Sequence, residues 1–351
     1  MELKINRKEL QNALQKVSGI VQKNVIIEAT EKTKLSTSNQ NSCIEVSCES
    51  EISKIGKVCV EFQRLFNLAK NYSGESLEFK TTKAGWLNIT GQNIKLRIPG
   101  VSDYPPVSFI PLKNTLKIDF RTGIDLAHHA TIENASRACF GGIYIVSENG
   151  RLTFTGADSF CFSRYYSKSE SDTKLLMLKQ TALEIEKLID ESTILYYDDS
   201  RIQLESDSVK FRSSLMQDHY PNIDILIDTE KKNVVSVDRE GLNGLINIFT
   251  DIAAAEKDPV VKFIFKKGKI SVESKKLDTG DGDGEIECNY QGDDVSIGIN
   301  LQVLKKSMTA INQTKDEKLN FHFDNPESSI ILTTESLQNY KAGLMPVRLQ
   351  W

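Results

Sequence analysis

The chain has 351 residues, of which 39% are apolar and 26% are charged, and its formal net charge is −4. This composition is ordinary for a globular protein, and no apolar run approaches the ~18 residues of a membrane helix. The first residues lack the apolar core of a signal peptide, so we expect no association with a membrane. The negative charge argues against phosphate-dominated binding over the whole surface, but it is compatible with a local basic face.

Six cysteines are scattered along the chain, and no pair of them has CxxC spacing. Neither a zinc site nor a disulfide framework is indicated, and a reducing cytoplasm is the expected compartment.

Three landmarks recur in the same order at intervals of about 115 residues, which is the signature of a repeated fold. The first is a short alternating segment before a helical run, at 3–6, 116–119 and 235–238. The second is a strand that leads into another helix, at 56–60, 173–177 and 295–299, and the third is a strand at 77–79, 194–196 and 319–321. We therefore predict three domains, 1–112, 113–229 and 230–351, each of a size that buries its own core.

Apolar residues at helical spacing predict two helices in each domain. In chain order the stripes lie at 10–17, 62–69, 124–130, 182–189, 242–249 and 301–311. Strands are predicted at 77–80, 86–90 and 94–98, and in the last of these Ile94, Leu96 and Ile98 alternate with basic residues. Each domain should have about six to eight strands, which makes the fold class α+β.

No catalytic motif or cofactor-binding loop is recognisable, so we expect a protein without enzymatic activity, cofactor or metal. His128 and His129 are adjacent, which on a regular helix directs them to different faces and disfavours a shared metal ion. The acidic stretch 280–285 fails the EF-hand pattern and is predicted to be a flexible turn.

The C-terminal run Met345-Pro346-Val347-Arg348-Leu349 resembles the end of the bacterial sliding clamp, the beta subunit of the replicative DNA polymerase. Weaker matches follow in family order at 15–19, 103–105, 220–222 and 289–292, so the resemblance spans the chain. It implies three tandem clamp domains in each chain and a homodimeric ring that encircles double-stranded DNA without sequence specificity. A ring of about twelve helices spaced ~9 Å apart encloses an opening about 25 Å across, the scale of a duplex.

The resemblance also implies a cleft for short peptides of the replicative polymerase, the clamp loader and other proteins with a clamp-binding motif. The matching positions are Phe140, Ala157, Ser159, Phe160, Cys161, Phe162, Pro221, Asn300, Met345, Pro346, Val347, Arg348 and Leu349. Apolar walls and an adaptable methionine suit a peptide site, although the same residues would also suit an interdomain core.

Two further surfaces follow from the same resemblance. The positions expected to face DNA are Lys23, Lys70, Asn134, Arg137, Lys305 and Lys306, for which a solvated helix face is the alternative. The positions expected at the seam between two copies are Ile94, Leu96 and Ile252, and domain core is the alternative for the first two. Lys95 and Arg97 are expected to face the acidic segment 278–285 across this seam.

The chain departs from the family pattern in the cleft. The family usually has Thr-Asp-Gly-His-Arg-Leu-Ala where residues 157–163 read Ala-Asp-Ser-Phe-Cys-Phe-Ser. The cleft should therefore be more apolar, and Trp351, beyond the usual end, is expected to cover or line it. The leading function is a DNA polymerase processivity factor. The alternatives are a diverged clamp that serves repair or a mobile element and, from another class, a carbohydrate- or nucleotide-processing enzyme on an unrelated repeat fold.

Overall fold

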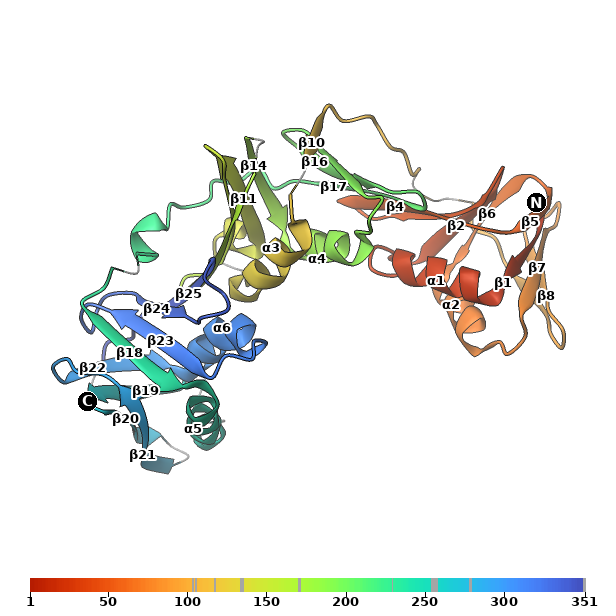
Figure 1. Cartoon of the computed structure of the whole chain (residues 1–351). Coiled ribbons are helices and arrows are strands. Elements are labelled where there is room, and N and C mark those ends of the chain that lie inside the picture. The colour runs from red at the N-terminus through yellow and green to blue at the C-terminus, as the bar shows by residue number, and fades with distance from the viewer. Residues whose placement is uncertain are drawn as a thin grey trace. The chain divides into compact units, whose positions relative to one another are not determined.

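The computed structural model describes residues 1–351 except 103, 105, 117, 133–135, 170–171, 229, 254–257, 278–279 and 350–351. Backbone contacts divide the chain into two compact units (Figure 1). The first comprises Met1–Lys117 and Gln180–Leu215, and the second comprises Ile118–Lys179 and Met216–Trp351. The middle third of the sequence contributes to both units, and the division into three domains stays a prediction. In the part of the chain that the structure describes, none of the helices combines the length and the apolar character that a membrane-spanning segment needs.

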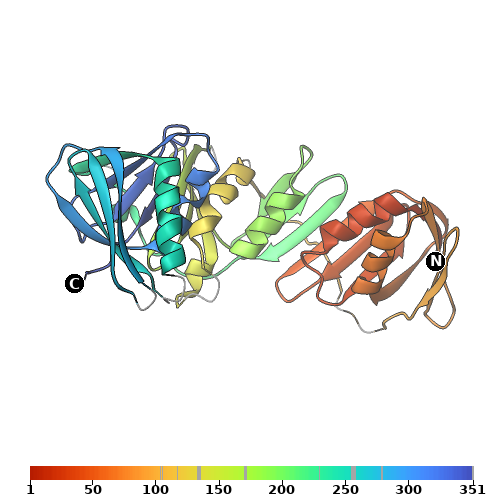
Figure 2. The ribbon, with the colours of Figure 1, turned by 90° about the horizontal axis from the view of Figure 1, so that it is seen from below.

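Two helices of the first unit lie side by side against its strands (Figure 2). Helix α1 (Arg7–Val17) begins after Asn6, whose side chain accepts a hydrogen bond from the Lys8 amide at 2.8 Å, a typical N-cap. Helix α2 (Phe62–Asn71) and helix α4 (Lys179–Leu188) follow the same amphipathic design. The predicted stripe of α1 is confirmed, because its buried residues are Leu10, Ala13, Leu14 and Val17.

The first unit contains two antiparallel sheets. The five-stranded sheet has the order β5 (Glu51–Lys54), β1 (Glu2–Asn6), β7 (Ser76–Thr81), β8 (Leu87–Thr90) and β9 (Lys95–Ile98). The eight-stranded sheet has the order β10 (Asn114–Leu116), β15 (Ile194–Tyr197), β16 (Arg201–Glu205), β17 (Val209–Ser214), β4 (Ser42–Cys48), β3 (Thr33–Ser38), β2 (Asn24–Ala29) and β6 (Gly56–Glu61). The pairing of β17 with β4 makes this sheet continuous between the first and middle thirds of the sequence.

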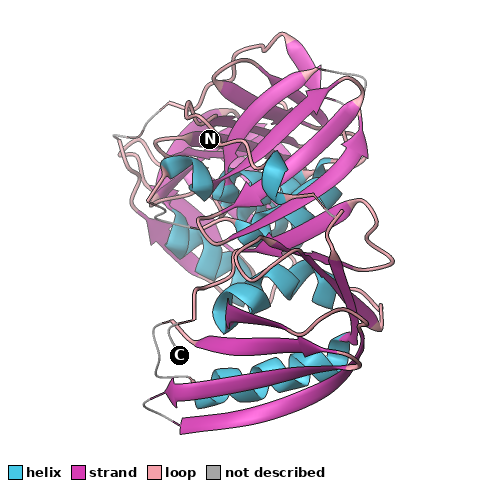
Figure 3. Ribbon diagram, turned by 90° about the vertical axis from the view of Figure 1, so that its left-hand side faces the viewer, coloured by secondary structure: helices cyan, strands magenta, loops and turns pink. Residues whose placement is uncertain are grey.

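The second unit is built on one twelve-stranded sheet with helices against it (Figure 3). The strand order is β14 (Thr173–Leu178), β11 (Gly142–Glu148), β12 (Arg151–Ala157), β13 (Cys161–Lys168), β25 (Tyr340–Leu344), β24 (Ile330–Thr333), β23 (Lys318–Phe323), β18 (Asn233–Asp238), β21 (Gly280–Asn289), β20 (Lys269–Leu277), β19 (Val260–Lys266) and β22 (Val295–Asn300). The helical elements are α3 (Phe120–Ala127), η1 (His128–Ala130), η2 (Ala138–Gly141), η3 (Asp224–Leu226), α5 (Arg239–Ile252) and α6 (Leu301–Asn312).

The threefold repeat is confirmed by the element order. Helices α1, α3 and α5 follow the short strands β1, β10 and β18, and helices α2, α4 and α6 directly follow β6, β14 and β22. The third landmark is β7, β15 and β23. The predicted α+β class with three tandem repeats is therefore correct.

The core of the last third lies between its helices and its strands. Phe265 contacts Phe263, Phe321 and Phe323 at ring-centroid distances of 4.7–6.2 Å. The apolar faces of α5 and α6 close over the strands with Leu242, Ile246, Phe249, Leu304, Met308 and Ile311. The amphipathic pattern of the sequence predicts that these faces are buried, and burial of apolar surface is the main force that stabilises such a domain.

The acidic stretch is a strand, so the prediction of a flexible turn at 280–285 is wrong. Residues Gly280–Asn289 form β21, and Gly284 pairs with Val272 on β20. A Cβ atom on Gly284 would lie 2.6 Å from Leu245 Cδ1 and 3.2 Å from Phe249 Cε2, so the glycine permits close packing of α5. The glycines that suggested a turn instead allow a helix to approach the strand.

Candidate functional site

The segment that departs from the family pattern is a tight turn between β12 and β13. The carboxylate of Asp158 accepts hydrogen bonds from the Phe160 and Cys161 amides at 2.6 and 2.7 Å. The Asp158 amide donates to the Cys161 carbonyl oxygen at 2.9 Å and closes the turn. In this turn the Asp158 side chain binds nearby backbone amides, and these hydrogen bonds fix the backbone at the exposed Phe160.

The second oxygen of the same carboxylate binds Lys306 of α6, with a distance of 2.6 Å between Lys306 Nζ and Asp158 Oδ2. The Asp158 side chain is 7% exposed and that of Lys306 is 28% exposed. Removal of either partner from a partly buried ion pair leaves an uncompensated charge, which is costly. The pair is therefore expected to stay formed in the folded protein. Lys306 therefore links α6 to the turn, whereas the sequence predicted it among the charges that face DNA.

Strand β13 directs alternate side chains to opposite faces of the sheet. Cys161 belongs to the core beneath the helices, whereas Phe162 packs with Phe140 and Ala157 in a second cluster. The remaining members of this second cluster are Cys139, Leu176, Tyr220, Ile223, Ile227 and Ile331. The predicted cleft residues Phe140, Ala157 and Phe162 thus belong to one buried apolar cluster, which we call the floor.

Phe162 pairs across the sheet with Gly343 of β25. A Cβ atom on Gly343 would lie 2.3 Å from Phe162 Cζ, so the ring occupies the space that a side chain at 343 would fill. The large side chain of Phe162 fills the space that the lack of a side chain at Gly343 leaves open, so the two positions are closely packed.

The C-terminal segment is anchored beside this floor. The Met345 amide donates to the Phe160 carbonyl oxygen at 2.8 Å, and the Val347 amide donates to the Gly298 carbonyl oxygen at 2.8 Å. Gly298 permits this approach, because a Cβ atom there would lie 2.2 Å from the Val347 carbonyl oxygen and 3.0 Å from Leu349 Cδ2. Pro346 and Leu349 are half-buried, and Arg348 forms an exposed ion pair with Glu327 at 3.0 Å.

The predicted set thus divides into a buried floor and an accessible rim. Ser159 is exposed and Phe160 is 60% exposed, whereas Met345, Val347 and Pro221 are half-buried. Asn300 has a structural role, since its side chain accepts hydrogen bonds from the amides of Gln302 and Val303 and caps α6. Trp351 lies outside the described residues.

A hollow of about 810 Å³ on the same sheet contains residues that the sequence did not suggest. Tyr144 stacks on Tyr220 with ring centroids 4.7 Å apart, and the Arg151 guanidinium lies 4.3 Å from the Tyr166 ring. Arg164 pairs with Asp224 of η3 at the wall. Pro221 of the predicted cleft lines this hollow. The match at 220–222 was the signal in the sequence that pointed to this part of the hollow.

Four of the positions expected to face DNA are exposed cations. Lys23 precedes β2, Lys70 is in α2, Arg137 precedes η2, and Lys305 is in α6. Across the described part of the chain, none of the four takes part in an ion pair, and Lys305 lines a polar hollow of about 710 Å³ between α5 and α6. Asn134 lies outside the described residues.

The predicted seam residues lie at the edges of elements. β9 is an edge strand of the five-stranded sheet, Leu96 on it is 44% exposed, and Ile94 immediately before it is half-buried. Ile252 is the last residue of α5 and is half-buried. Core packing, the alternative for Leu96, does not account for its exposure. Asp278 and Thr279 at the start of the acidic stretch lie outside the described residues.

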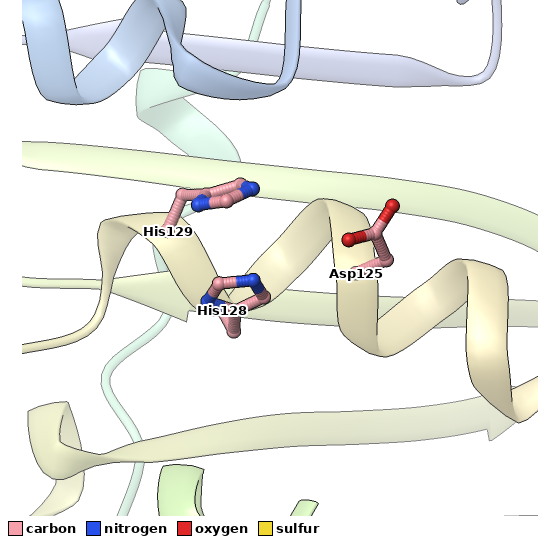
Figure 4. Close-up of side chains that lie close together, drawn as sticks. All are labelled: Asp125, His128 and His129. Atoms are coloured by element: carbon pink, nitrogen blue, oxygen red, sulfur yellow. The ribbon is translucent and has the colours of Figure 1, made fainter. Parts of the chain in front are cut away.

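The histidine pair is closer than the sequence suggested. The rings of His128 and His129 have centroids 3.9 Å apart, and both lie near Asp125 (Figure 4). The expectation that they point to different faces is wrong, since the two rings lie in contact where the regular α-helix has ended at Ala127 and the segment His128–Ala130 begins. Burial lowers the pKa of His128 to about 4 and also lowers the pKa of His129.

Residues 225–348 match the family model described as DNA polymerase III beta subunit, C-terminal domain. Over 378 aligned residues the chain is 22% identical to the beta sliding clamp of Chlamydia pneumoniae, with 99% of each chain covered. It is 21% identical over 377 residues to the beta sliding clamp of Caulobacter vibrioides, with 99% of this chain and 100% of that protein covered.

Two solved structures show the same fold over 99% of this chain and 100% of theirs. The DNA polymerase III subunit beta from Pseudomonas aeruginosa has a TM-score of 0.91 at 17% identity, and the beta subunit from DNA polymerase of Streptococcus pyogenes has a TM-score of 0.91 at 20% identity.

Proposed function

We propose that this chain, which belongs to the bacterial sliding clamp family as a diverged member, is a DNA polymerase processivity factor. In this proposal two copies close into a ring that encircles duplex DNA in the cytoplasm and slides along it. Partner proteins, including the replicative polymerase and the clamp loader, dock through a short peptide. The chain performs no reaction of its own, and no feature of its described residues favours a role restricted to repair or to a mobile element.

The observation that carries the proposal is the pairing of β13 with β25. Cys161 pairs with Leu344 and Phe162 pairs with Gly343, and this register places the 157–162 turn beside the C-terminal segment. Two stretches that are about 180 residues apart in the sequence thereby lie side by side. The exposed Phe160 and the half-buried Met345 and Val347 adjoin the buried floor, and a mainly apolar surface of this kind suits a bound peptide. The likeness of the whole chain to solved beta subunits supports the fold on which this proposal rests.

Weak contact with DNA suits a ring, because a closed ring holds DNA by topology and tight contacts would stop it from sliding. A net charge of −4 with scattered exposed cations is consistent with this. Lys23, Lys70, Arg137 and Lys305 would supply phosphate contacts that position the duplex without reading its sequence. In contrast, the Lys306 ammonium is paired with Asp158 and contributes less.

The cleft is tested with a fluorescent peptide that carries a clamp-binding motif. Phe160→Ala removes the exposed aromatic ring at the rim without disturbing the core, and we expect at least about fivefold weaker binding, or ~1 kcal/mol. Ile55→Ala, which truncates a side chain that is 72% exposed in the first unit, is the matched control and should bind normally. Equal affinity of the wild type and Phe160→Ala would reject the assignment of the rim.

A further inference from the structure

The end of α3 brings three potential metal ligands together in the second unit. Asp125, His128 and His129 each offer one ligand atom, and these atoms lie within 4.8 Å of one another. Their i, i+3 and i+4 spacing places Asp125 one turn before the two histidines. The two imidazoles lie next to each other in η1, the 3-10 segment His128–Ala130 that follows α3 (Figure 4).

Two nitrogen atoms of this cluster have no partner. Within the described residues, His128 Nδ1 and His129 Nε2 are shielded from solvent and accept or donate no hydrogen bond. Buried polar atoms in native structures are almost always hydrogen-bonded, so an orphaned pair in adjacent residues needs an explanation. The two rings lie against each other with their planes tilted by 45°, and this contact gives neither nitrogen atom a hydrogen-bond partner among the described residues.

We propose that Asp125, His128 and His129 bind a divalent transition-metal ion, with Zn²⁺ as the expected ion. Two imidazole nitrogens and one carboxylate oxygen form a donor set that suits Zn²⁺ and neighbouring first-row ions rather than Mg²⁺ or Ca²⁺. A three-ligand set leaves a fourth position for water. This site is independent of the proposed partner cleft and of the ring.

The three ligand atoms must move closer together to bind one ion. Zn–N distances of about 2.0 Å place two ligand atoms on one tetrahedral ion roughly 3.3 Å apart, so ligand atoms that lie up to 4.8 Å apart must approach by up to about 1.5 Å. Asp125 is exposed and is free to adopt another rotamer, whereas the half-buried histidines are already in place. Lys179 is close enough to affect both imidazoles and opposes a cation, and the Asp125 carboxylate offsets this charge. A bound ion would connect the last turn of α3 to η1.

The site is tested on the full chain after treatment with a chelator, by calorimetric titration with Zn²⁺ and by the visible absorption of Co²⁺. We expect one equivalent to bind, with d–d bands of a tetrahedral site. His128→Gln and His129→Gln should each weaken binding by at least about tenfold, as loss of a ligand requires. His219→Gln, which changes an exposed histidine elsewhere in the unit, should leave binding unchanged.

Unchanged affinity in His128→Gln and His129→Gln, or the absence of saturable binding to the wild type, would overturn the proposal. Far-UV circular dichroism establishes whether the histidine variants fold. If they do not, Asp125→Asn decides the question, because its side chain is exposed and the substitution preserves its size. A tenfold loss of affinity in that variant supports the site, and unchanged affinity rejects it.

Discussion

At the scale of single residues, the fit of Phe162 against Gly343 defines the floor of the proposed cleft. The ring fills the volume that any side chain at 343 would need, and the Ile330 carbonyl oxygen lies 2.9 Å from the position of a Cβ atom there. The packing of the floor is therefore sensitive to the size of the residue at position 343, although glycine contributes no side chain there. This differs from the rim, where the Phe160 side chain is 60% exposed.

We predict that Gly343→Ala destabilises the protein by about 1–3 kcal/mol, because the added methyl group overpacks the floor. Phe162→Leu in the same chain should relieve part of this cost, so the double variant should be more stable than the sum of the single changes by at least ~0.5 kcal/mol. Urea denaturation of the wild type and the three variants measures the cycle. Additive effects would show that the two residues do not share one volume.

The thiols give a prediction about pH and reactivity. Burial raises the pKa of Cys48 and Cys161 to about 12 and that of Cys59 to about 11, and Cys288 is the partly exposed member of the six. Since the thiolate is the reactive form, native protein at pH 8 should react with a disulfide reagent first at Cys288. The neutral buried thiols contribute stability below pH 9, and this contribution is lost as the pH rises toward 12.

Reaction with Ellman's reagent, followed by mass spectrometry, measures the order in which the thiols react. Cys288→Ser should remove the fast phase and leave the slow thiols unchanged. Labelling of Cys161 at the rate of Cys288 would contradict its burial.

At the scale of elements, α5 depends on a strand that carries glycine at every second position over 280–284. We predict that Gly284→Val costs about 1–3 kcal/mol, because its side chain would enter the space of Leu245 and Phe249. Gly282→Val is the matched control on the same strand, where a Cβ atom meets nothing within 4 Å. Thermal denaturation compares the two, and equal melting temperatures would contradict the close packing of α5 on β21.

The elements were predictable to different degrees, for physical reasons. The six α-helices of the described residues were all expected from the spacing of their apolar residues, since burial of one face is a local property of the sequence. β21 was missed because glycine and aspartate usually mark turns, and its strand form depends on α5 and β20. The proximity of His128 and His129 was missed because the regular helix ends at Ala127, so helical spacing does not give the directions of the two side chains.

The sequence predicted which residues belong to the candidate site, but it did not predict how they are arranged. The resemblance placed residues 157–162 and 345–349 in one cleft, and the register of β13 with β25 separates them into floor and rim. The ion pair of Lys306 with Asp158 could not be foreseen, because it joins residues 148 positions apart. The tyrosines and arginines of the adjacent hollow are separated in sequence and carry no motif.

At the scale of the whole molecule, the proposed ring depends on a seam between two copies. Leu96 on the edge strand β9 is exposed in one chain and would be covered in a closed ring. We predict that Leu96→Asp shifts the protein from dimer to monomer in sedimentation velocity at micromolar concentration, because an unpaired carboxylate would be buried at the seam. Ile55→Asp introduces the same charge at an exposed position of the same unit and should stay dimeric.

The central claim is that the protein holds DNA by encircling it. The most direct test loads the protein onto nicked circular DNA with a clamp loader and measures its retention before and after linearisation with a restriction enzyme. The account predicts stable retention on the circle at elevated salt and rapid loss from the linear form, because a ring slides off a free end. Equal retention on both forms, or loss from both as salt is raised, would contradict topological binding and indicate a direct electrostatic complex.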